Sequence, residues 1–136
     1  MEIRIYKDDC QGDEFYSLMG PFFADKNFLK IFGEPLHNEP KSTWFVAVDK
    51  KEVVGFCTVF QKNKYAFLNQ FFVVDGYKNK GVGSSLFDTR LDFLKDVKEI
   101  RAMVKEDKSF HLYKKNKFSV YGKRGNYSLV KRIGGE

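Results

Sequence analysis

The chain has 136 residues, of which 43% are hydrophobic and 31% charged, which excludes extended disorder and favours one folded domain spanning residues 1–136. No stretch reaches the ~20 apolar residues of a membrane helix, and the first residues do not resemble a secretion signal, so we expect a cytoplasmic protein. The net charge of +6 is uneven, because residues 1–70 contribute −1 and residues 71–136 contribute +7. A basic half of this kind suits nucleic acid, an acidic membrane surface or a phosphorylated cofactor.

The sequence gives little support for metal chemistry. The two cysteines, Cys10 and Cys57, and the two histidines, His37 and His111, have none of the spacings that hold zinc. Cys57 lies inside an apolar, strand-like run, where a thiol behaves as a small hydrophobic side chain. We therefore expect no metal cofactor, and a structural role for Cys57.

The first half of the chain begins with a strand over residues 2–6, where hydrophobic and polar positions alternate. Asp8 and Asp9 are suited to cap a helix over residues 11–23, and a second short helix is predicted over residues 26–32. Three runs rich in Val, Phe and Tyr follow, separated by short polar connections. They predict an antiparallel meander with strands over residues 44–48, 52–61 and 65–74.

The second half begins with a helix over residues 82–95, whose apolar positions form one broad face. The sequence then predicts, in order, a strand over 99–104, a helix over 108–116, and a hairpin of strands 118–123 and 126–133 across Arg124-Gly125. This order indicates an α+β fold around one mixed, mostly antiparallel sheet of about seven strands, with about four helices.

The segment that joins the meander to the helix at residue 82 carries Lys78, Lys80, Gly81 and Gly83. Glycines let the backbone approach a ligand closely, and the first amides of a helix have no internal acceptor. The positive end of the helix dipole points to the same place, so the pattern predicts a pyrophosphate site to which Ser84 adds a hydroxyl. Two such glycines taken alone would more simply shape a turn, but the lysines and the helix start favour a ligand.

This run, Lys78-Asn79-Lys80-Gly81-Val82-Gly83, resembles the acyl-CoA-binding motif Q/R-x-x-G-x-G/A of the GNAT N-acetyltransferase superfamily, with Lys78 where Arg or Gln is usual. The run 109–118 resembles the family's later signature A-x-x-x-Y-x-x-x-G-F, in which Tyr113 and Phe118 match while Ser109 and Lys117 replace Ala and Gly. The predicted order of elements is also similar to that of the family, so the resemblance extends over nearly the whole chain.

The resemblance implies that the strand over 67–74 and the strand over 99–104 splay apart and admit the pantetheine arm of acetyl-CoA. Backbone groups of Phe72, Val73 and Val74 would then bond the arm, and the Val73 amide would polarise the thioester carbonyl. The phosphates would be held by Lys78, Asn79, Lys80, Gly81, Val82, Gly83 and Ser84.

The reaction implied by the resemblance is direct attack of an uncharged amine on the thioester, with Tyr113 as the general acid that protonates the departing thiolate. The structural alternative is that Tyr113 packs against the helix over 82–95 with its hydroxyl in water. Residues 65–71 contain no carboxylate to act as a base, so Asn69 or Gln70 would only position a water. Three further base candidates, each more simply explained as an ordinary surface residue, are Glu14, His37 and His111.

The resemblance places the acceptor site at residues 20–37 and around the hairpin at 122–126. The aromatic residues of the first segment are more simply explained as core. The acceptor itself is unidentified, either a small amine or a lysine or N-terminus of a partner protein. Two alternatives stay open: a GNAT-fold protein directed to nucleic acid or a nucleic-acid-associated protein, and a non-catalytic acyl-CoA-binding module. The sequence does not distinguish a monomer from a homodimer.

Overall fold

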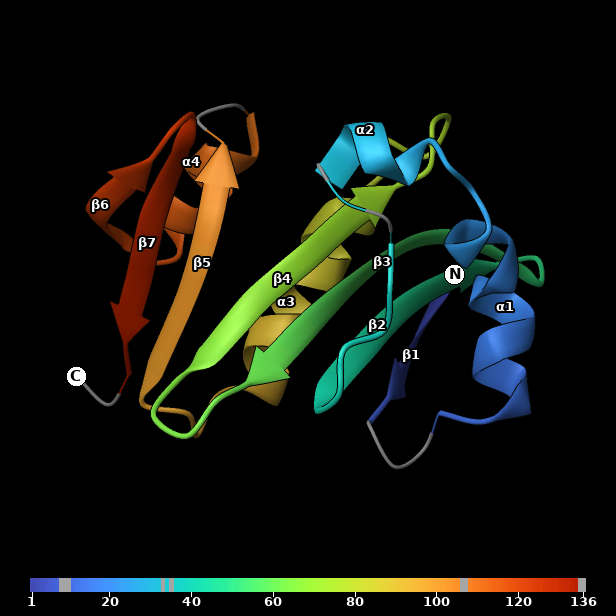
Figure 1. Cartoon of the computed structure of the whole chain (residues 1–136), viewed down its shortest axis with the longest axis horizontal. Coiled ribbons are helices and arrows are strands. Elements are labelled where there is room, and N and C mark those ends of the chain that lie inside the picture. The colour runs from blue at the N-terminus through green and yellow to red at the C-terminus, as the bar shows by residue number, and fades with distance from the viewer. Residues whose placement is uncertain (8–10, 33, 35, 106–107, 135–136) are drawn as a thin grey trace.

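A seven-stranded sheet forms the centre of the computed structural model, which describes residues 1–7, 11–32, 34, 36–105 and 108–134 (Figure 1). The strands lie in the order β1-β2-β3-β4-β5-β7-β6. Within the described residues β4 and β5 form the one parallel pair, and the other neighbours are antiparallel. The strands are β1 (Glu2–Tyr6), β2 (Ser42–Asp49), β3 (Glu52–Gln61), β4 (Ala66–Val73), β5 (Glu99–Lys105), β6 (Ser119–Arg124) and β7 (Tyr127–Ile133).

The helices cover both faces of this sheet, α1 and α2 on one face and α3 and α4 on the other (Figure 1). Their bounds are α1 (Asp13–Phe23), α2 (Phe28–Phe32), α3 (Val82–Phe93) and α4 (Lys108–Lys115). The expected α+β fold, with a mixed sheet of seven strands and four helices, is therefore confirmed.

Two hydrophobic cores result from strands that are apolar on both faces. Along β2, for example, Phe45 belongs to the core under α3 and Trp44 to the core under α1 and α2. Phe28 of α2 is also buried, and its ring meets that of Phe72 at 4.9 Å between centroids. The aromatic residues of the 20–37 segment thus contribute to the core, as the simpler interpretation predicts. Cys57 is fully buried, and burial raises the pKa of its thiol to about 11, in keeping with a structural role.

Several boundaries differ from the sequence prediction. Helix α1 begins at Asp13 with Gly12 as its N-cap, not at residue 11, and Asp8 and Asp9 lie outside the described residues. The first turn of α1 instead carries the acidic side chains of Asp13 and Glu14, which interact favourably with the positive end of the helix dipole. Helix α3 ends at Phe93 rather than at residue 95, and α2 begins at Phe28 rather than at residue 26. The hairpin turns at Gly125-Asn126, one residue later than predicted, because Gly125 supplies the positive φ of 60°.

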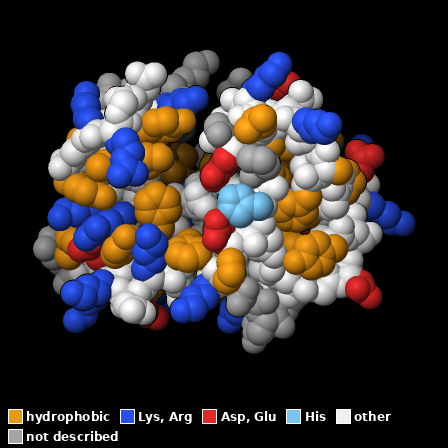
Figure 2. Space-filling model, viewed as in Figure 1, with side chains coloured by type: hydrophobic (Ala, Val, Ile, Leu, Met, Phe, Trp, Pro, Cys, Tyr) orange, Lys and Arg blue, Asp and Glu red, His pale blue; other side chains and the backbone are white. Residues whose placement is uncertain are grey.

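Basic and hydrophobic side chains are interleaved on the half of the molecule that contains β5, β6 and β7 (Figure 2). This is the C-terminal half, which carries the excess of +7. Some of the half-buried and exposed rings already have a cation of the protein itself against them. The Arg101 guanidinium lies 4.1 Å from the Tyr65 ring centroid, and Lys131 Nζ lies 5.3 Å from that of Tyr121.

The close packing of α3 on the sheet depends on Gly55 of β3. A Cβ there would lie 3.0 Å from the Phe72 carbonyl oxygen and 3.1 Å from both Leu86 Cδ1 and Val82 Cγ1. We expect Gly55→Ala to lower the free energy of unfolding by about 1–3 kcal/mol, because the strand carbonyl cannot give way. The matched control is Gly20→Ala in α1, where the added Cβ meets nothing within 4 Å and helix propensity predicts a gain of about 0.5–1 kcal/mol. Urea denaturation of both variants checks this, and equal stabilities would contradict it.

Candidate active site

The turn before α3 presents backbone donors to solvent. Gly81 is the N-cap and has a φ of 84°, a left-handed conformation that favours glycine. No side chain of the described residues caps it, and the first helical bond runs from Ser85 N to the Gly81 carbonyl at 3.0 Å. The amides of Val82, Gly83 and Ser84 therefore have no helical carbonyl to reach. Together with the helix dipole they form a site suited to an anion.

The side chains around this turn are arranged in two layers. The Val82 side chain is buried in the core and fixes the start of the helix, whereas Asn79, Lys80 and Ser84 are exposed. Lys78, also exposed, forms an ion pair with Asp75 at 3.1 Å. Lys80 Nζ lies 5.5 Å from the Tyr77 ring centroid. Surface ion pairs and exposed cation–π contacts of this kind are weak, so both lysines can turn to an incoming phosphate. The structure thus gathers all seven residues predicted to contact phosphate at one turn.

Strand β4 has an edge with unused backbone groups beside this turn. Its ladder with β5 runs only from Ala66–Ile100 to Leu68–Ala102, and beyond it the two strands diverge (Figure 1). On the other edge, Val74 N donates to the Val54 carbonyl at 2.9 Å. In an antiparallel pair, the backbone N–H and C=O groups of successive residues point alternately toward the partner strand and away from it. The backbone groups of Phe72, like those of Val74, therefore point to β3, whereas the backbone groups of Phe71 and Val73 point to the diverging side. Of the three residues predicted to bond the arm, only Val73 has its amide on that side.

A β-bulge precedes this stretch of β4. Asn69 and Gln70 together oppose Thr58 of β3, because the pairing shifts by one residue between Leu68–Val59 and Phe71–Cys57. The backbone amide of Gln70 donates to Thr58 Oγ1 at 3.1 Å, and the buried side-chain nitrogen of Gln70, Nε2, has no hydrogen-bond partner among the described residues. Such a bulge bends and twists a strand, which accounts for the early end of the β4–β5 ladder. It also sets Asn69, half-buried, just before the open edge.

Tyr113 of α4 is 6% exposed, and its hydroxyl accepts a hydrogen bond from Arg90 Nη2 at 3.2 Å. Its ring packs edge-on against Phe87 of α3 and Phe118, with centroids 5.0 and 5.3 Å apart. The packing against α3 agrees with the structural alternative, but the hydroxyl is engaged by a guanidinium instead of lying in water. Because the phenolic oxygen accepts from Arg90, its own proton is available to an acceptor on a substrate.

Arg90 was not singled out from the sequence. A signal was present, because Arg90 follows Leu86 by four residues and Phe87 by three, which places it on the buried face of α3. Its side chain is fully buried.

The other base candidates lie apart from this arrangement or in ordinary surroundings. Glu14 accepts hydrogen bonds from Tyr6 at 2.7 Å and Arg4 at 2.8 Å, beside β1, which β2 and β3 separate from β4. The bond from Tyr6, followed by the charge and bond of Arg4, lowers the Glu14 pKa, so this carboxylate stays ionised. His37 contacts Glu39, and His111 is exposed on α4 while Tyr113 of the same helix is buried.

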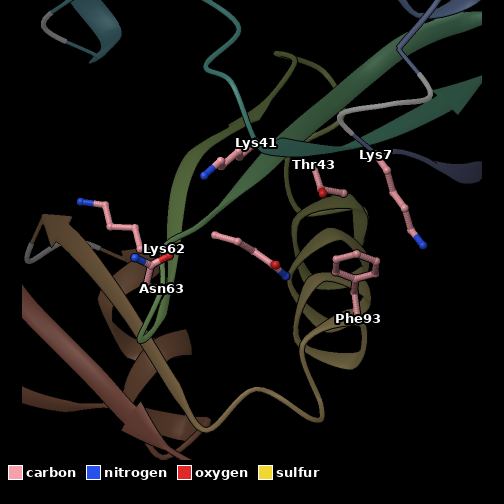
Figure 3. Close-up of a pocket in the computed structure, with 7 residues that line it drawn as sticks. Lys7, Lys41, Thr43, Lys62, Asn63 and Phe93 are labelled. Atoms are coloured by element: carbon pink, nitrogen blue, oxygen red, sulfur yellow. The ribbon is translucent and has the colours of Figure 1, made fainter.

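Two surface hollows of the described residues lie away from the turn at Gly81. One of about 580 Å³ is lined by Lys7, Lys41 and Lys62 together with Phe93 (Figure 3). Phe93 ends α3, so this hollow lies roughly 18 Å along the helix axis from Gly81. A second hollow, of about 730 Å³, is bordered by the C-terminal half of α3 and by β7. Neither touches the residues predicted to bind the cofactor.

The described part of the chain contains neither a cluster of metal-binding side chains nor a helix that could span a membrane. No three His, Cys, Asp or Glu side chains of these residues gather closely enough to hold a metal ion. No helix in the same residues has the length and apolar character needed to cross a bilayer.

Comparison with known proteins places this geometry in a family. Residues 5–118 match the model of the Acetyltransferase (GNAT) family. None of the curated proteins matches the chain in sequence. Among solved structures, an acyl-CoA N-acyltransferase from Pseudomonas aeruginosa is similar in fold, with a TM-score of 0.74 and 8% identity over 97% of this chain and 99% of the other. The PaiA N-acetyltransferase from Thermoplasma acidophilum, crystallised with coenzyme A, has a TM-score of 0.67 and 18% identity over 98% and 99% of the two chains.

An acetyltransferase of the GNAT family from Staphylococcus aureus Mu50 has a TM-score of 0.65 and 16% identity, over 97% of this chain and 99% of the other. At these identities the structural likeness shows the fold, while the family match spans most of the chain. The chain belongs to the GNAT family of acetyltransferases.

Proposed function

We propose that this protein transfers the acetyl group of acetyl-CoA to a primary amine by direct attack of the amine on the thioester. The observation that carries the proposal is the set of three amides at the start of α3 that have no intrahelical acceptor and no side-chain cap among the described residues, next to the open edge of β4. A diphosphate fits the amides at the start of α3, and an extended amide-containing arm fits the open edge of β4. The coenzyme A bound by the Thermoplasma acidophilum relative supports this choice of ligand.

In this proposal the cofactor lies across the turn and then along β4. The pyrophosphate accepts from the amides of Val82, Gly83 and Ser84, and Lys78, Asn79 and Lys80 contact it from outside. Gly81 permits the turn. The pantetheine amides pair with the backbone groups of Val73, and here Phe71 is added to the residues that the sequence suggested. Phe72 and Val74 are withdrawn as backbone partners of the arm, since their groups face β3.

The chemistry uses groups along the same edge. The amine nitrogen bonds to the thioester carbon, and the carbonyl electron pair moves to oxygen, where the Val73 amide stabilises it. Collapse of this intermediate breaks the C–S bond, and Tyr113 gives its proton to the sulfur. The nitrogen loses a proton to water, for which Asn69 at the bulge is a positioning group, because β4 carries no carboxylate.

Binding of acetyl-CoA is the first expected result. At 100 times its dissociation constant, acetyl-CoA should stabilise the fold by about 2.7 kcal/mol, which thermal denaturation detects as a rise in melting temperature. Release of free thiol in the presence of a panel of amines then reports turnover and identifies the acceptor. No stabilisation by acetyl-CoA would contradict the proposal, and stabilisation without turnover on any small or protein amine would favour a non-catalytic acyl-CoA-binding module.

The nucleic-acid alternative rests on the basic half of the molecule (Figure 2). We favour the acetyltransferase because Lys78 and Lys80 lie just before the amides suited to phosphate, and exposed rings such as Tyr121 already have cations of the protein against them. Random duplex DNA distinguishes the two. Tight binding that weakens steeply with salt would support the alternative.

A further inference from the structure

Arg90 is a buried cation without a buried anion. Its guanidinium is fully buried, and it forms no ion pair with any acidic side chain that the structure describes. Nη1 donates to the Thr58 carbonyl at 3.4 Å and Nη2 to the Tyr113 hydroxyl at 3.2 Å. Nε has no hydrogen-bond partner among the described residues. The ring centroids of Phe71 and Phe87 lie 5.2 and 5.7 Å from the guanidinium carbon, Cζ.

This arrangement is costly for a resting protein. Burying a charge without a counter-charge costs several kcal/mol, and two aromatic faces and two neutral acceptors offset only part of it. A methionine or leucine at position 90 would fill the same apolar face of α3 at no such cost. The positive charge therefore points to an anion that is present only at a later stage of the protein's cycle.

The position of Arg90 shows where such an anion would arise. The side chain extends from α3 to β3 and lies over the ring of Phe71, a β4 residue beyond the ladder whose backbone faces the diverging side. The Tyr113 hydroxyl comes from α4, which packs on β5. The Arg90–Tyr113 hydrogen bond thus links the elements on either side of the point where β4 and β5 diverge.

We propose that Arg90 is a positioning residue that stabilises, through the Tyr113 hydroxyl, the negative charge on the sulfur of coenzyme A when the C–S bond breaks. This inference rests on the proposed function. Arg90 itself is buried and touches no substrate, so it acts only through Tyr113.

The charge balance of the step is simple. When the C–S bond breaks, its electron pair goes to sulfur, and the thiolate accepts a hydrogen bond from the Tyr113 O–H. As the proton moves from oxygen to sulfur, the negative charge moves to the phenolic oxygen, which already accepts a hydrogen bond from Arg90. Water that has taken the amine proton returns a proton to Tyr113. One C–N bond has formed, one C–S bond has broken, and Arg90 takes no part in the proton transfers.

Few titratable side chains other than these two lie near the Arg90–Tyr113 hydrogen bond. In the described structure, Arg90 of α3 is faced by Tyr113 of α4 and by Cys57 of β3, and from β4 by the uncharged ring of Phe71. Burial raises the Cys57 pKa to about 11, and the Arg90 charge opposes that rise. Cys57 is therefore a neutral thiol between pH 7 and 9, the range in which a free thiol of pKa about 8.5 ionises.

The test compares coenzyme A with desulfo-coenzyme A, which lacks the thiol. The Arg90 charge strengthens the Tyr113 O–H as a donor and so favours the thiolate, which means that coenzyme A should bind more tightly as the pH rises, whereas desulfo-coenzyme A should not. Titration calorimetry of the wild-type protein at pH 7 and 9 should show the ratio of the two affinities rising about five- to tenfold. In Arg90→Met the ratio should stay constant, and in Arg90→Lys, which keeps the charge, part of the rise should remain.

Desulfo-coenzyme A binding also reports whether each variant is folded. If Arg90→Met does not bind it, Tyr113→Phe takes its place, since this variant keeps the ring packing and should likewise lose the pH-dependent rise. A constant ratio in the wild-type protein, or an undiminished rise in Arg90→Met or Tyr113→Phe, would overturn the inference and leave the proposed function intact. A wild-type protein that binds neither compound would instead overturn the proposed function.

Discussion

Tyr113→Phe should lower kcat by ~10- to 1000-fold while leaving the affinity for acetyl-CoA nearly unchanged. The substitution removes the proton that the departing thiolate needs, but it keeps the ring that packs against Phe87 and Phe118. The pyrophosphate amides and the β4 edge lie elsewhere, so the ground-state interactions with the cofactor should persist.

Steady-state thiol release with an accepted amine, together with titration calorimetry, separates the two quantities. Tyr121→Phe on β6 is the matched control, because Tyr121 is exposed and should contribute nothing to turnover. Tyr113→Phe also removes one of the two hydrogen-bond acceptors of Arg90 and leaves a buried donor unpaired. Urea denaturation should therefore show that the free energy of unfolding falls by about 1–3 kcal/mol. Unchanged turnover would remove Tyr113 from the mechanism.

Ser84→Asp should weaken acetyl-CoA binding by about 30- to 100-fold. The carboxylate would lie at the start of α3, where it repels a diphosphate at surface-like dielectric by about 2–3 kcal/mol. The same carboxylate interacts favourably with the helix dipole, so the fold should be as stable as before or slightly more so. Affinity and stability are therefore expected to change in opposite directions.

The control for this variant is Ser84→Ala, which removes the hydroxyl but leaves all three amides available. Its affinity should fall only a few-fold, by the loss of one hydrogen bond. Added salt should bring the dissociation constants of the two variants closer together, because it screens the repulsion between the Asp carboxylate and the diphosphate. Equal dissociation constants for Ser84→Asp and Ser84→Ala in calorimetry would mean that no anion binds at this helix start.

The elements of this fold were predictable where periodicity and turn chemistry agreed. The bounds of β3 were predicted to the residue, and so was the start of α3, because the glycines before Val82 mark a turn and an apolar face begins there. The predicted start of α1 is two residues early and its predicted end is correct, since the helix begins after Gly12 and ends at Phe23. Local patterns resolve such alternatives poorly when several polar residues precede an apolar run.

The candidate site was predictable only in part. The phosphate turn follows from local sequence, since glycines, lysines and a helix start are all adjacent. The bulge at Asn69 and Gln70 depends on the pairing of β4 with β3, and no local signal in either strand specifies it. The same holds for the direction of each β4 amide, which is why Phe72 and Val74 were expected to bond the cofactor. Arg90 was missed because a charged residue is assumed to face solvent.

In the proposed mechanism, coenzyme A binds to the amides at the start of α3 and to the Val73 amide. The most direct measurement is a two-dimensional amide NMR spectrum of isotope-labelled protein, recorded while coenzyme A is added to saturation. The largest shifts are predicted at the amides of Val82, Gly83, Ser84 and Val73, with little change at Val74, whose amide is bonded to Val54. Unmoved resonances at the start of α3 under saturation, with the changes located instead around Lys41 and Lys62, would contradict the account.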